Sequence, residues 1–438
     1  MPGRRGTRRR RSIPAAAIIA ALAVGLSGCF SGAVDPAAEF EPVDAALGQD
    51  LSAQLDAVLD QAVQLSGSSG GVAGVWAPWA VEWTGASGTV DFSEKAQPAN
   101  PEASFRMTTL TTEVTCTILL RLVDEGTVAL DDEVERYVDR IPTLEGITLE
   151  QLCRHTSGLG DYYPVLRSHF VSNPQRNWPP VELLSNGLAL TRTGPPGEQV
   201  RESRTGILLL ALALERRTGR SWSDLAEQYV FTPLGIENTR IPDPGDMTHD
   251  GVLGAYSAAI AQNGTIDCAV LLDDSSQSSS VGGAAAGAVS TLEDARKLSQ
   301  AFATGTLLSE RTEREQWAAL PLGGSAPAWQ SMALGAMQYG PLRGSAGETT
   351  GALTAAFTDP ESGLTVVVAL NNSTSGADFV REVAFALASL GSKAAPAPER
   401  KLPLVELPWS FEQATAKMAE LAKCPRTEES APQPVEAG

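Results

Sequence analysis

Hydrophobic residues recur at helical spacing in several separate stretches of the chain. Residues 51–65, LSAQLDAVLDQAVQL, carry leucine or valine every three or four positions, which predicts an amphipathic helix. The run 205–218 is strongly apolar and is followed by Gly219, a suitable C-terminal cap. By the same criteria, further helices are predicted at 113–124, 148–154, 291–303, 380–390 and 411–423.

Short apolar runs bounded by turn residues predict strands near both ends of the chain. Gly70-Gly71 leads into VAGVWA and AVEWTG, two runs with a proline-containing turn between them, which predicts a hairpin. LTAAFTDP and GLTVVVALNN, joined by the turn residues 359–363, predict a second pair. Residues 274–287 are rich in Ser, Gly and Ala and are expected to be irregular. Helix and strands at both ends therefore flank a mostly helical middle, an α/β (α+β) arrangement.

The first 28 residues resemble an export signal. Six arginines and no acid in positions 1–12 precede an apolar run, Ile13 to Leu26, that is shorter than the ~20 residues of a membrane-spanning helix. The run ends in Leu26-Ser27-Gly28-Cys29, which resembles the lipobox of bacterial lipoproteins, whose cysteine is lipidated. We expect a signal peptide over 1–28 and a lipid anchor on Cys29, at the outer face of the cytoplasmic membrane. Plain secretion is the alternative.

Composition divides the rest of the chain into three segments. Residues 29–50 are Ala-, Pro- and acid-rich and predict a tether, and 51–390 carry the elements of one domain. Residues 391–438 predict a linker, a short helix and a disordered acidic tail. Without the signal, 27 basic residues face 52 acidic ones, a formal charge of −25. That balance excludes nucleic acid as the expected partner and also electrostatic docking on anionic lipid.

The cysteines other than Cys29 do not suggest a metal site. No pair has metal-ligand spacing and the three histidines are dispersed, so neither a metal nor another cofactor is expected. Cys116 and Cys153 lie in apolar helical runs and are expected to be buried free thiols. Cys268 and Cys424 lie in polar segments, where a disulfide between them would pin the C-terminal tail to the body of the protein.

Several strings, in consistent order over roughly residues 50–390, resemble the serine β-lactamase and penicillin-binding protein (DD-peptidase) superfamily, in its class C-like branch. They are Phe105-Arg106-Met107, Leu122-Val123-Asp124-Glu125-Gly126 with Leu130-Asp131-Asp132, Ile147-Thr148-Leu149, Gln151-Leu152 with His155-Thr156-Ser157-Gly158-Leu159, Pro196-Gly197, Thr205-Gly206, Thr218-Gly219, Pro233-Leu234-Gly235-Ile236, and Ser290-Thr291 with Glu293-Asp294. The resemblance implies an antiparallel sheet flanked by helices, built from both chain ends, plus an all-helical region. It also implies a cleft between them for acylation chemistry.

The catalytic elements of that superfamily are replaced here. Its S-x-x-K places a nucleophile and a lysine on one helix face, and its Tyr-x-Asn and Lys/His-x-Gly elements assist proton transfer and steer the substrate. The positions that match them are Thr109 with Thr112, Glu202 with Arg204, and Ser345 with Gly347. None of the six lysines has a serine three residues before it. The resemblance therefore predicts a scaffold without its usual chemistry.

Three hypotheses follow for function. The first is a lipid-anchored, catalytically inactive protein of the cell envelope whose old cleft binds a peptide or a cell-wall-derived small ligand. That cleft would comprise Thr109, Thr112, Glu113, Glu202, Arg204, Ser345 and Gly347. The second is an active serine-hydrolase-type enzyme (β-lactamase, DD-carboxypeptidase or esterase-like) using Thr109 or other cleft residues, with Glu202 as a conceivable base. The third is a scaffold that binds only proteins.

The pair Glu202 and Arg204 leaves two interpretations open. Arg204 could receive a ligand carboxylate with two parallel hydrogen bonds, which would suit a peptide C-terminus. Alternatively, Glu202 and Arg204 pair with each other and fill the space of the missing tyrosine and asparagine, which is the interpretation that we favour from the sequence.

Overall fold

The computed structural model describes residues 40, 48–139, 141–243, 246, 251–261 and 263–426. The chain divides into two units, Met1–Gly32 and Ala33–Gly438, and all of the described residues belong to the second. The predicted signal peptide with Cys29, and the predicted acidic tail from residue 427, lie outside the described residues. Within the described ranges, no helix is both long enough and apolar enough to span a membrane.

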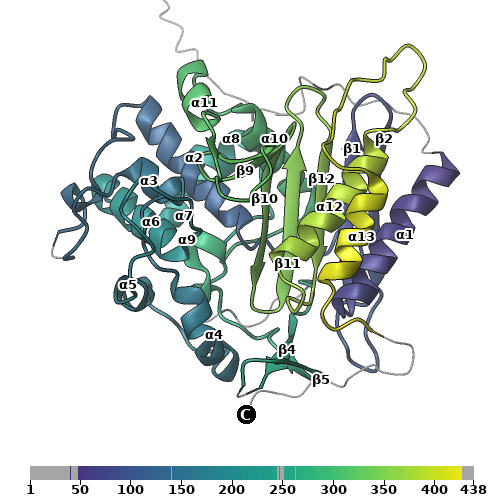
Figure 1. The fold of residues 1–438 in the computed structure, drawn as a ribbon, viewed down its shortest axis with the longest axis horizontal. Helices are drawn as coiled ribbons and strands as arrows, with labels where there is room; N and C mark the ends of the chain where they lie inside the picture. The colour runs from purple at the N-terminus through teal and green to yellow at the C-terminus, as the bar shows by residue number, and fades with distance from the viewer. Residues whose placement is uncertain are drawn as a thin grey trace, which may run out of the picture. The chain divides into compact units, whose positions relative to one another are not determined.

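An eight-stranded antiparallel sheet lies at the centre, in the order β2-β1-β12-β11-β10-β9-β8-β7 (Figure 1). The N-terminal hairpin pairs with the C-terminal strand, with Gly71 opposite Leu370 and Trp76 opposite Thr365. Both chain ends therefore build one sheet, as the resemblance implied. The strands are β1 (Gly70–Ala77), β2 (Val81–Gly88), β7 (Leu320–Pro321), β8 (Gln330–Met332), β9 (Met337–Tyr339), β10 (Leu342–Thr349), β11 (Ala352–Thr358) and β12 (Thr365–Leu370).

Alternate residues of the central strands enter two different hydrophobic cores. Val367 and Ala369 of β12 pack toward the helical region, whereas Val366 and Val368 pack against the opposite layer. Because side chains of a strand alternate between the two faces of the sheet, a strand covered on both sides is apolar throughout. This explains the continuous run TVVVAL of β12, in which every residue is buried.

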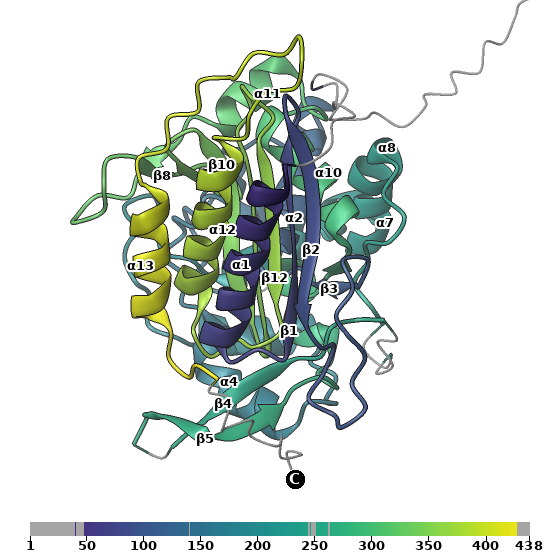
Figure 2. The same ribbon diagram turned by 90° about the vertical axis from the view of Figure 1, so that its right-hand side faces the viewer.

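Three helices cover one face of the sheet. They are α1 (Gln49–Ser66), α12 (Ala377–Gly391) and α13 (Phe411–Leu421), and Figure 2 shows them side by side in front of the strands. The spacing of Leu55, Val58 and Leu59 on α1 puts all three in the core beneath it. Helix α13 also joins this core through Ala414 and Met418, so the segment after residue 391 is partly packed onto the domain.

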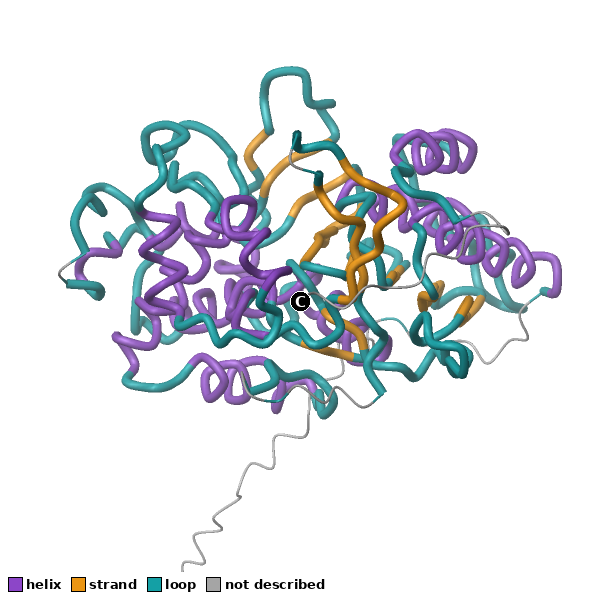
Figure 3. The backbone as a smooth tube through the Cα atoms, turned by 90° about the horizontal axis from the view of Figure 1, so that it is seen from below, coloured by secondary structure: helices purple, strands orange, loops and turns teal. Residues whose placement is uncertain are grey.

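The helical region lies against the opposite face, around the long helix α2 (Leu110–Asp124), which is buried on nearly all sides (Figures 1 and 3). Around it lie α3 (Leu149–Cys153), α4 (Tyr162–Ser172), α5 (Pro180–Leu188), α6 (Arg204–Thr218), α7 (Trp222–Ala226), α8 (Thr232–Leu234), α9 (Gly283–Ala286), α10 (Leu292–Thr304) and α11 (Glu310–Gln316). Ser203 caps the start of α6 by accepting from the Gly206 amide, and Gly219 ends it with a φ of 72°.

Short strands complete the domain. Strand β3 (Phe105–Arg106) pairs with β6 (Val289–Ser290), and β4 (Tyr256–Ile260) pairs with β5 (Ile266–Asp273) as a separate hairpin. The segment expected to be irregular, 274–287, contains a short 3-10 turn at Ser279–Val281 and the one-turn helix α9.

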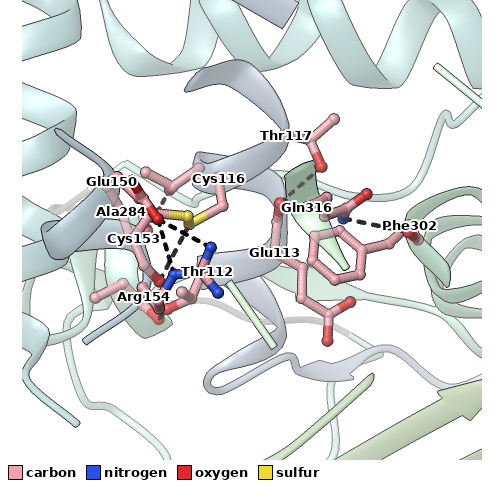
Figure 4. The surroundings of a disulfide bond; sticks show 12 residues. Thr112, Glu113, Cys116, Thr117, Glu150, Cys153, Arg154, Ala284, Phe302 and Gln316 are labelled. Carbon is pink, nitrogen blue, oxygen red and sulfur yellow. Dashed lines mark hydrogen bonds and ion pairs between the residues drawn. A yellow bond between two sulfur atoms is a disulfide. The ribbon is translucent and has the colours of Figure 1, made fainter. Parts of the chain in front are cut away.

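Two disulfides link distant segments. Cys268 of β5 is bonded to Cys424, which follows α13, with a Cα–Cα distance of 5.4 Å. Cys116 of α2 is bonded to Cys153 of α3, with a Cα–Cα distance of 5.8 Å (Figure 4). The prediction of free thiols at Cys116 and Cys153 is therefore wrong. Their apolar surroundings were predicted correctly, but only the packing of α3 on α2 brings the two Cβ atoms within bonding range.

Candidate functional site

The start of α2 carries the residues at the nucleophile and lysine positions. Thr109 is the N-cap of this helix, and its Oγ1 is buried with no hydrogen-bond partner among the described residues. Thr112, one turn later, donates its hydroxyl to the backbone oxygen of Ala285 on α9, at 3.0 Å. Thr112 is therefore occupied by a structural hydrogen bond and supplies no base to Thr109.

Strand β10 forms the opposite wall. Ser345 and Gly347 share one face of the strand, and Ser345 is 8% exposed. A Cβ atom at position 347 would overlap the side chain of Thr109. Glycine at this position therefore allows β10 to approach the start of α2 this closely. On its other edge β10 pairs with β9 only over Leu342–Gly344, which leaves its second half without a strand partner on that side.

Arg204, at the start of α6, reaches across to β10. Its Nη1 forms an ion pair with Asp161 at 3.0 Å, and its Nη2 donates to the backbone oxygen of Glu348 at 2.8 Å. Its guanidinium also stacks over the Tyr163 ring, 3.8 Å from the centroid. Arg204 therefore binds the backbone oxygen of Glu348, in the part of β10 that does not pair with β9. This hydrogen bond connects the start of α6 to the strand.

The favoured interpretation of Glu202 and Arg204 is thus wrong. The partner of Arg204 is Asp161, the N-cap of α4, which also accepts the backbone N–H of Arg204 at 3.3 Å. For Glu202 no hydrogen bond or ion pair is found within the described part of the chain. Sequence reasoning missed Asp161 because its role depends on how α4 packs beside α6, which no local string encodes.

Five of the seven expected cleft residues line one cavity of about 50 Å³, namely Thr109, Thr112, Glu202, Arg204 and Ser345. Ile207, Met332, Met337 and Tyr339 supply much of its apolar wall. A larger open groove of about 1000 Å³ adjoins it and shares Glu202, Met332, Met337 and Tyr339. Glu202, an exposed residue, therefore lies where the cavity meets the groove.

Glu113 lies outside this cavity, contrary to expectation. It lines a small apolar cavity beside α2 with residues such as Leu298 and Phe302, and Figure 4 shows its carboxyl near the Phe302 ring. Glu113 is 4% exposed, and its Oε1 has no hydrogen-bond partner among the described residues. Burial raises its pKa to about 8, against the opposing effect of a hydrogen bond with the Ser345 hydroxyl. Glu113 is therefore protonated at neutral pH.

His155 also lines the cavity. The sequence analysis found it within a string that resembles the family but did not include it among the cleft residues. Its φ is +55°, and its Nδ1 accepts the backbone N–H of Ser203 at 3.3 Å. Burial lowers the pKa of His155 to about 4, and the charge of Arg204 acts in the same direction. The ring is therefore uncharged at neutral pH and helps to position the start of α6. Its place in the string His155-Thr156-Ser157-Gly158-Leu159 was the available signal.

In the described ranges, no group of three or more His, Cys, Asp or Glu side chains is arranged to hold a metal ion.

Comparison with known proteins identifies the family of this scaffold. The family model for Beta-lactamase matches residues 55–390. The chain is similar to the D-alanyl-D-alanine-carboxypeptidase/endopeptidase AmpH of Escherichia coli (strain K12), with 31% identity over 36% of this chain and 42% of that protein. It is also similar to a D-aminopeptidase of Cereibacter sphaeroides (strain KD131 / KCTC 12085), with 30% identity over 47% of this chain and 39% of that protein. The chain thus spans about two fifths of the length of these curated relatives.

Solved structures agree on the fold. A D-stereospecific amidohydrolase from Streptomyces sp. superposes with a TM-score of 0.63 at 24% identity, covering 76% of this chain and 98% of that one. At this identity the likeness supports the fold alone. The match of the family model, residues 55–390, covers more than half of the chain. The chain therefore belongs to the β-lactamase family, the serine-hydrolase-type family that also includes penicillin-binding proteins.

Proposed function

We propose that this protein is a non-catalytic member of the family, anchored to the cell envelope through Cys29, which uses the old catalytic cleft to bind a ligand. The observation that carries the proposal is the state of Thr109 and Thr112. The Thr109 hydroxyl has no hydrogen-bond partner among the described residues, and Thr112 donates its hydroxyl to the Ala285 carbonyl. A hydroxyl nucleophile at neutral pH needs an adjacent base, and loss of a general base typically costs about 10²–10⁴-fold in rate.

No side chain of the cavity accepts a hydrogen bond from Thr109 as the lysine of the family would, and Glu202, which lines the same cavity, makes no hydrogen bond with it among the described residues. All six lysines of the chain are among the described residues, and none of them lines the cavity. The cationic group that is present, Arg204, keeps its charge and is paired with Asp161. His155 accepts a backbone N–H through Nδ1, so its remaining nitrogen carries the proton and is not a base. The cavity itself persists, which supports retained binding.

Covalent labelling tests the absence of catalysis. We expect no added mass on the purified protein after incubation with a penicillin or an alkyl fluorophosphonate, as measured by intact-protein mass spectrometry. Acylation would overturn the proposal. The variants Thr109→Ala and Ser345→Ala would then locate the nucleophile, with Thr117→Ala, elsewhere on α2, as the control.

The lipid anchor is tested separately, in a bacterial host with the full chain. We expect the wild-type protein in the membrane pellet and its amino-terminal peptide to carry a diacylglycerol mass on Cys29. The Cys29→Ala variant should leave the membrane fraction. Unchanged membrane association of that variant would refute anchoring through Cys29.

A further inference from the structure

The charged groups that line the cavity do not cancel. Asp161 and Arg204 form a partly buried ion pair, with side chains 17% and 14% exposed, and so contribute no net charge. His155 is uncharged at neutral pH because burial lowers its pKa to about 4. Glu202 has no ion-pair or hydrogen-bond partner anywhere in the described ranges. The cavity therefore presents one carboxyl group, that of Glu202, without an ion-pair partner among the described residues.

Neighbouring elements place both carboxylates and one cation, Arg204, around Glu202. Loss of water in the cleft and the carboxylates of Asp161, Asp378 and Glu348 raise its pKa, while Arg204 lowers it. Because Glu202 is exposed, water screens these effects. On α12, Arg381 is already held by Asp378 at 2.5 Å and by Glu382 at 2.9 Å.

An anionic ligand has little to bind in this cavity. A carboxylate is held best by two parallel N–H groups of an arginine. Both terminal nitrogens of Arg204 are used, by Asp161 and by the Glu348 carbonyl, and only its buried Nε lacks a partner. Receiving a carboxylate on both terminal nitrogens would require Arg204 to break the Asp161 pair.

The remaining wall suits an apolar group next to a cation. Ile207, Met332 and Met337 line it, and the ring of Tyr339 lies on the boundary with the groove. An aromatic ring attracts a cation over its face and also packs against apolar groups. The unpartnered Thr109 Oγ1 lies in the same wall and offers a hydrogen bond that the protein leaves unused.

We infer that the cleft binds a primary ammonium group attached to an apolar group, with Glu202 as the counter-ion. The apolar group enters the cavity, and the rest of the ligand extends into the groove. This inference rests on the proposed function, because it takes the ligand to be bound rather than hydrolysed. The ammonium can come from the amino terminus of a peptide or from a lysine-like side chain.

Calorimetric titration with two matched probes tests the inference. Phenylalanine amide carries the ammonium, and N-acetyl-phenylalanine amide has the same ring and amide without the charge. We expect the wild-type protein to bind phenylalanine amide about tenfold more tightly than the acetylated probe at neutral pH, the ratio for one charge-assisted hydrogen bond. The preference should shrink as salt is added, because the site is open to water.

The variant Glu202→Gln should lose this preference and bind both probes alike. Glu198→Gln is the matched control, because Glu198 is an exposed carboxylate that lines the groove but not the cavity. It should keep the preference. Equal affinity of the wild-type protein for both probes, no binding of either probe, or a preference that survives in Glu202→Gln would overturn the inference.

Two further arms separate the source of the ammonium and the fate of the ligand. A short peptide with a free phenylalanine amino terminus is compared with N-acetyl-lysine amide, and tighter binding of one identifies the source. Ammonia release from phenylalanine amide is followed in parallel. Hydrolysis of phenylalanine amide together with a preference for the ammonium probe would refute the proposed lack of catalysis but not the inference. Binding of the acetylated probe alone, without hydrolysis, would refute the inference but not the proposed function.

Discussion

The ionisation of Glu113 makes the free energy of unfolding depend on pH. Its contribution can be measured by comparing the wild-type protein with a variant in which this side chain cannot ionise. Its carboxyl is 4% exposed, lies in an apolar cavity beside α2 and has one oxygen without a partner. Burial raises its pKa to about 8, from the ordinary value of 4.5 for a glutamate. The change that we consider is Glu113→Gln, which keeps the shape and a polar end but cannot ionise.

The sign and size of the effect follow from linkage. Between about pH 4.5 and about pH 8 the folded protein keeps the Glu113 proton, which the unfolded chain has lost. The folded state therefore binds more protons, and its stability falls as the pH rises through this window. The slope is about 1.4 kcal/mol per pH unit, so the whole window corresponds to about 5 kcal/mol as an order of magnitude.

The assay is urea unfolding of the wild-type protein and the variant at about pH 5 and about pH 8. The wild type should lose stability relative to Glu113→Gln by a few kcal/mol between these pH values, because only the wild type has a carboxyl at this position whose ionisation opposes folding. Other titrating groups affect both proteins equally and cancel in the difference. Glu135→Gln, at an exposed surface carboxylate, should follow the wild type. A Glu113→Gln curve parallel to that of the wild type would refute the reasoning.

Three further substitutions test contacts around the cleft and the tail. Gly347→Ala should destabilise the protein by about 1–3 kcal/mol through overpacking against Thr109. The double variant with Thr109→Ala should recover only part of this in thermal unfolding, because it removes Oγ1 and Cγ2 but keeps the Cβ atom 2.7 Å from the new methyl group; equal losses in both would contradict it. Arg204→Leu should cost about 3 kcal/mol in urea unfolding, since it leaves a partly buried carboxylate unpaired. Cys268→Ser should cost about 2–4 kcal/mol in the same assay, and wild-type stability would show that the bond to Cys424 is dispensable.

The sequence alone determined the fold class, because the fold depends on periodicity and order. The apolar runs of β11 and β12, bounded by turn residues, and the helical spacing in α1, α2 and α6 are local properties of the chain. The ordered strings identified the superfamily, and the match of the family model over 55–390 confirms it. Counting from the same strings gave Thr109 and Ser345 as the residues predicted to stand at catalytic positions, and both line one cavity.

What the replaced residues do was decided only by the tertiary structure. Arg204 and Glu202 are two positions apart and of opposite charge, so the sequence suggested a pair. The packing of α4 beside α6 brings Asp161 to Arg204 instead and leaves Glu202 without a partner. Likewise, Glu113 is next to Thr112 in the sequence but faces another cavity, because successive side chains of a helix point about 100° apart.

For the disulfide Cys116–Cys153 too, the sequence predicted one property and the tertiary structure decided another. Each cysteine was correctly expected to be buried, since burial follows from the apolar character of its own helix. Their bond depends on the distance between two helices that are 37 residues apart in the sequence. Local pattern therefore predicted the strongly periodic or apolar elements, such as α1, α2, α6, β1 and β12, but not short ones such as α7 and β9. The pairing of charges, thiols and cavity walls was decided by how the elements pack, because long-range distances are not encoded in any single segment.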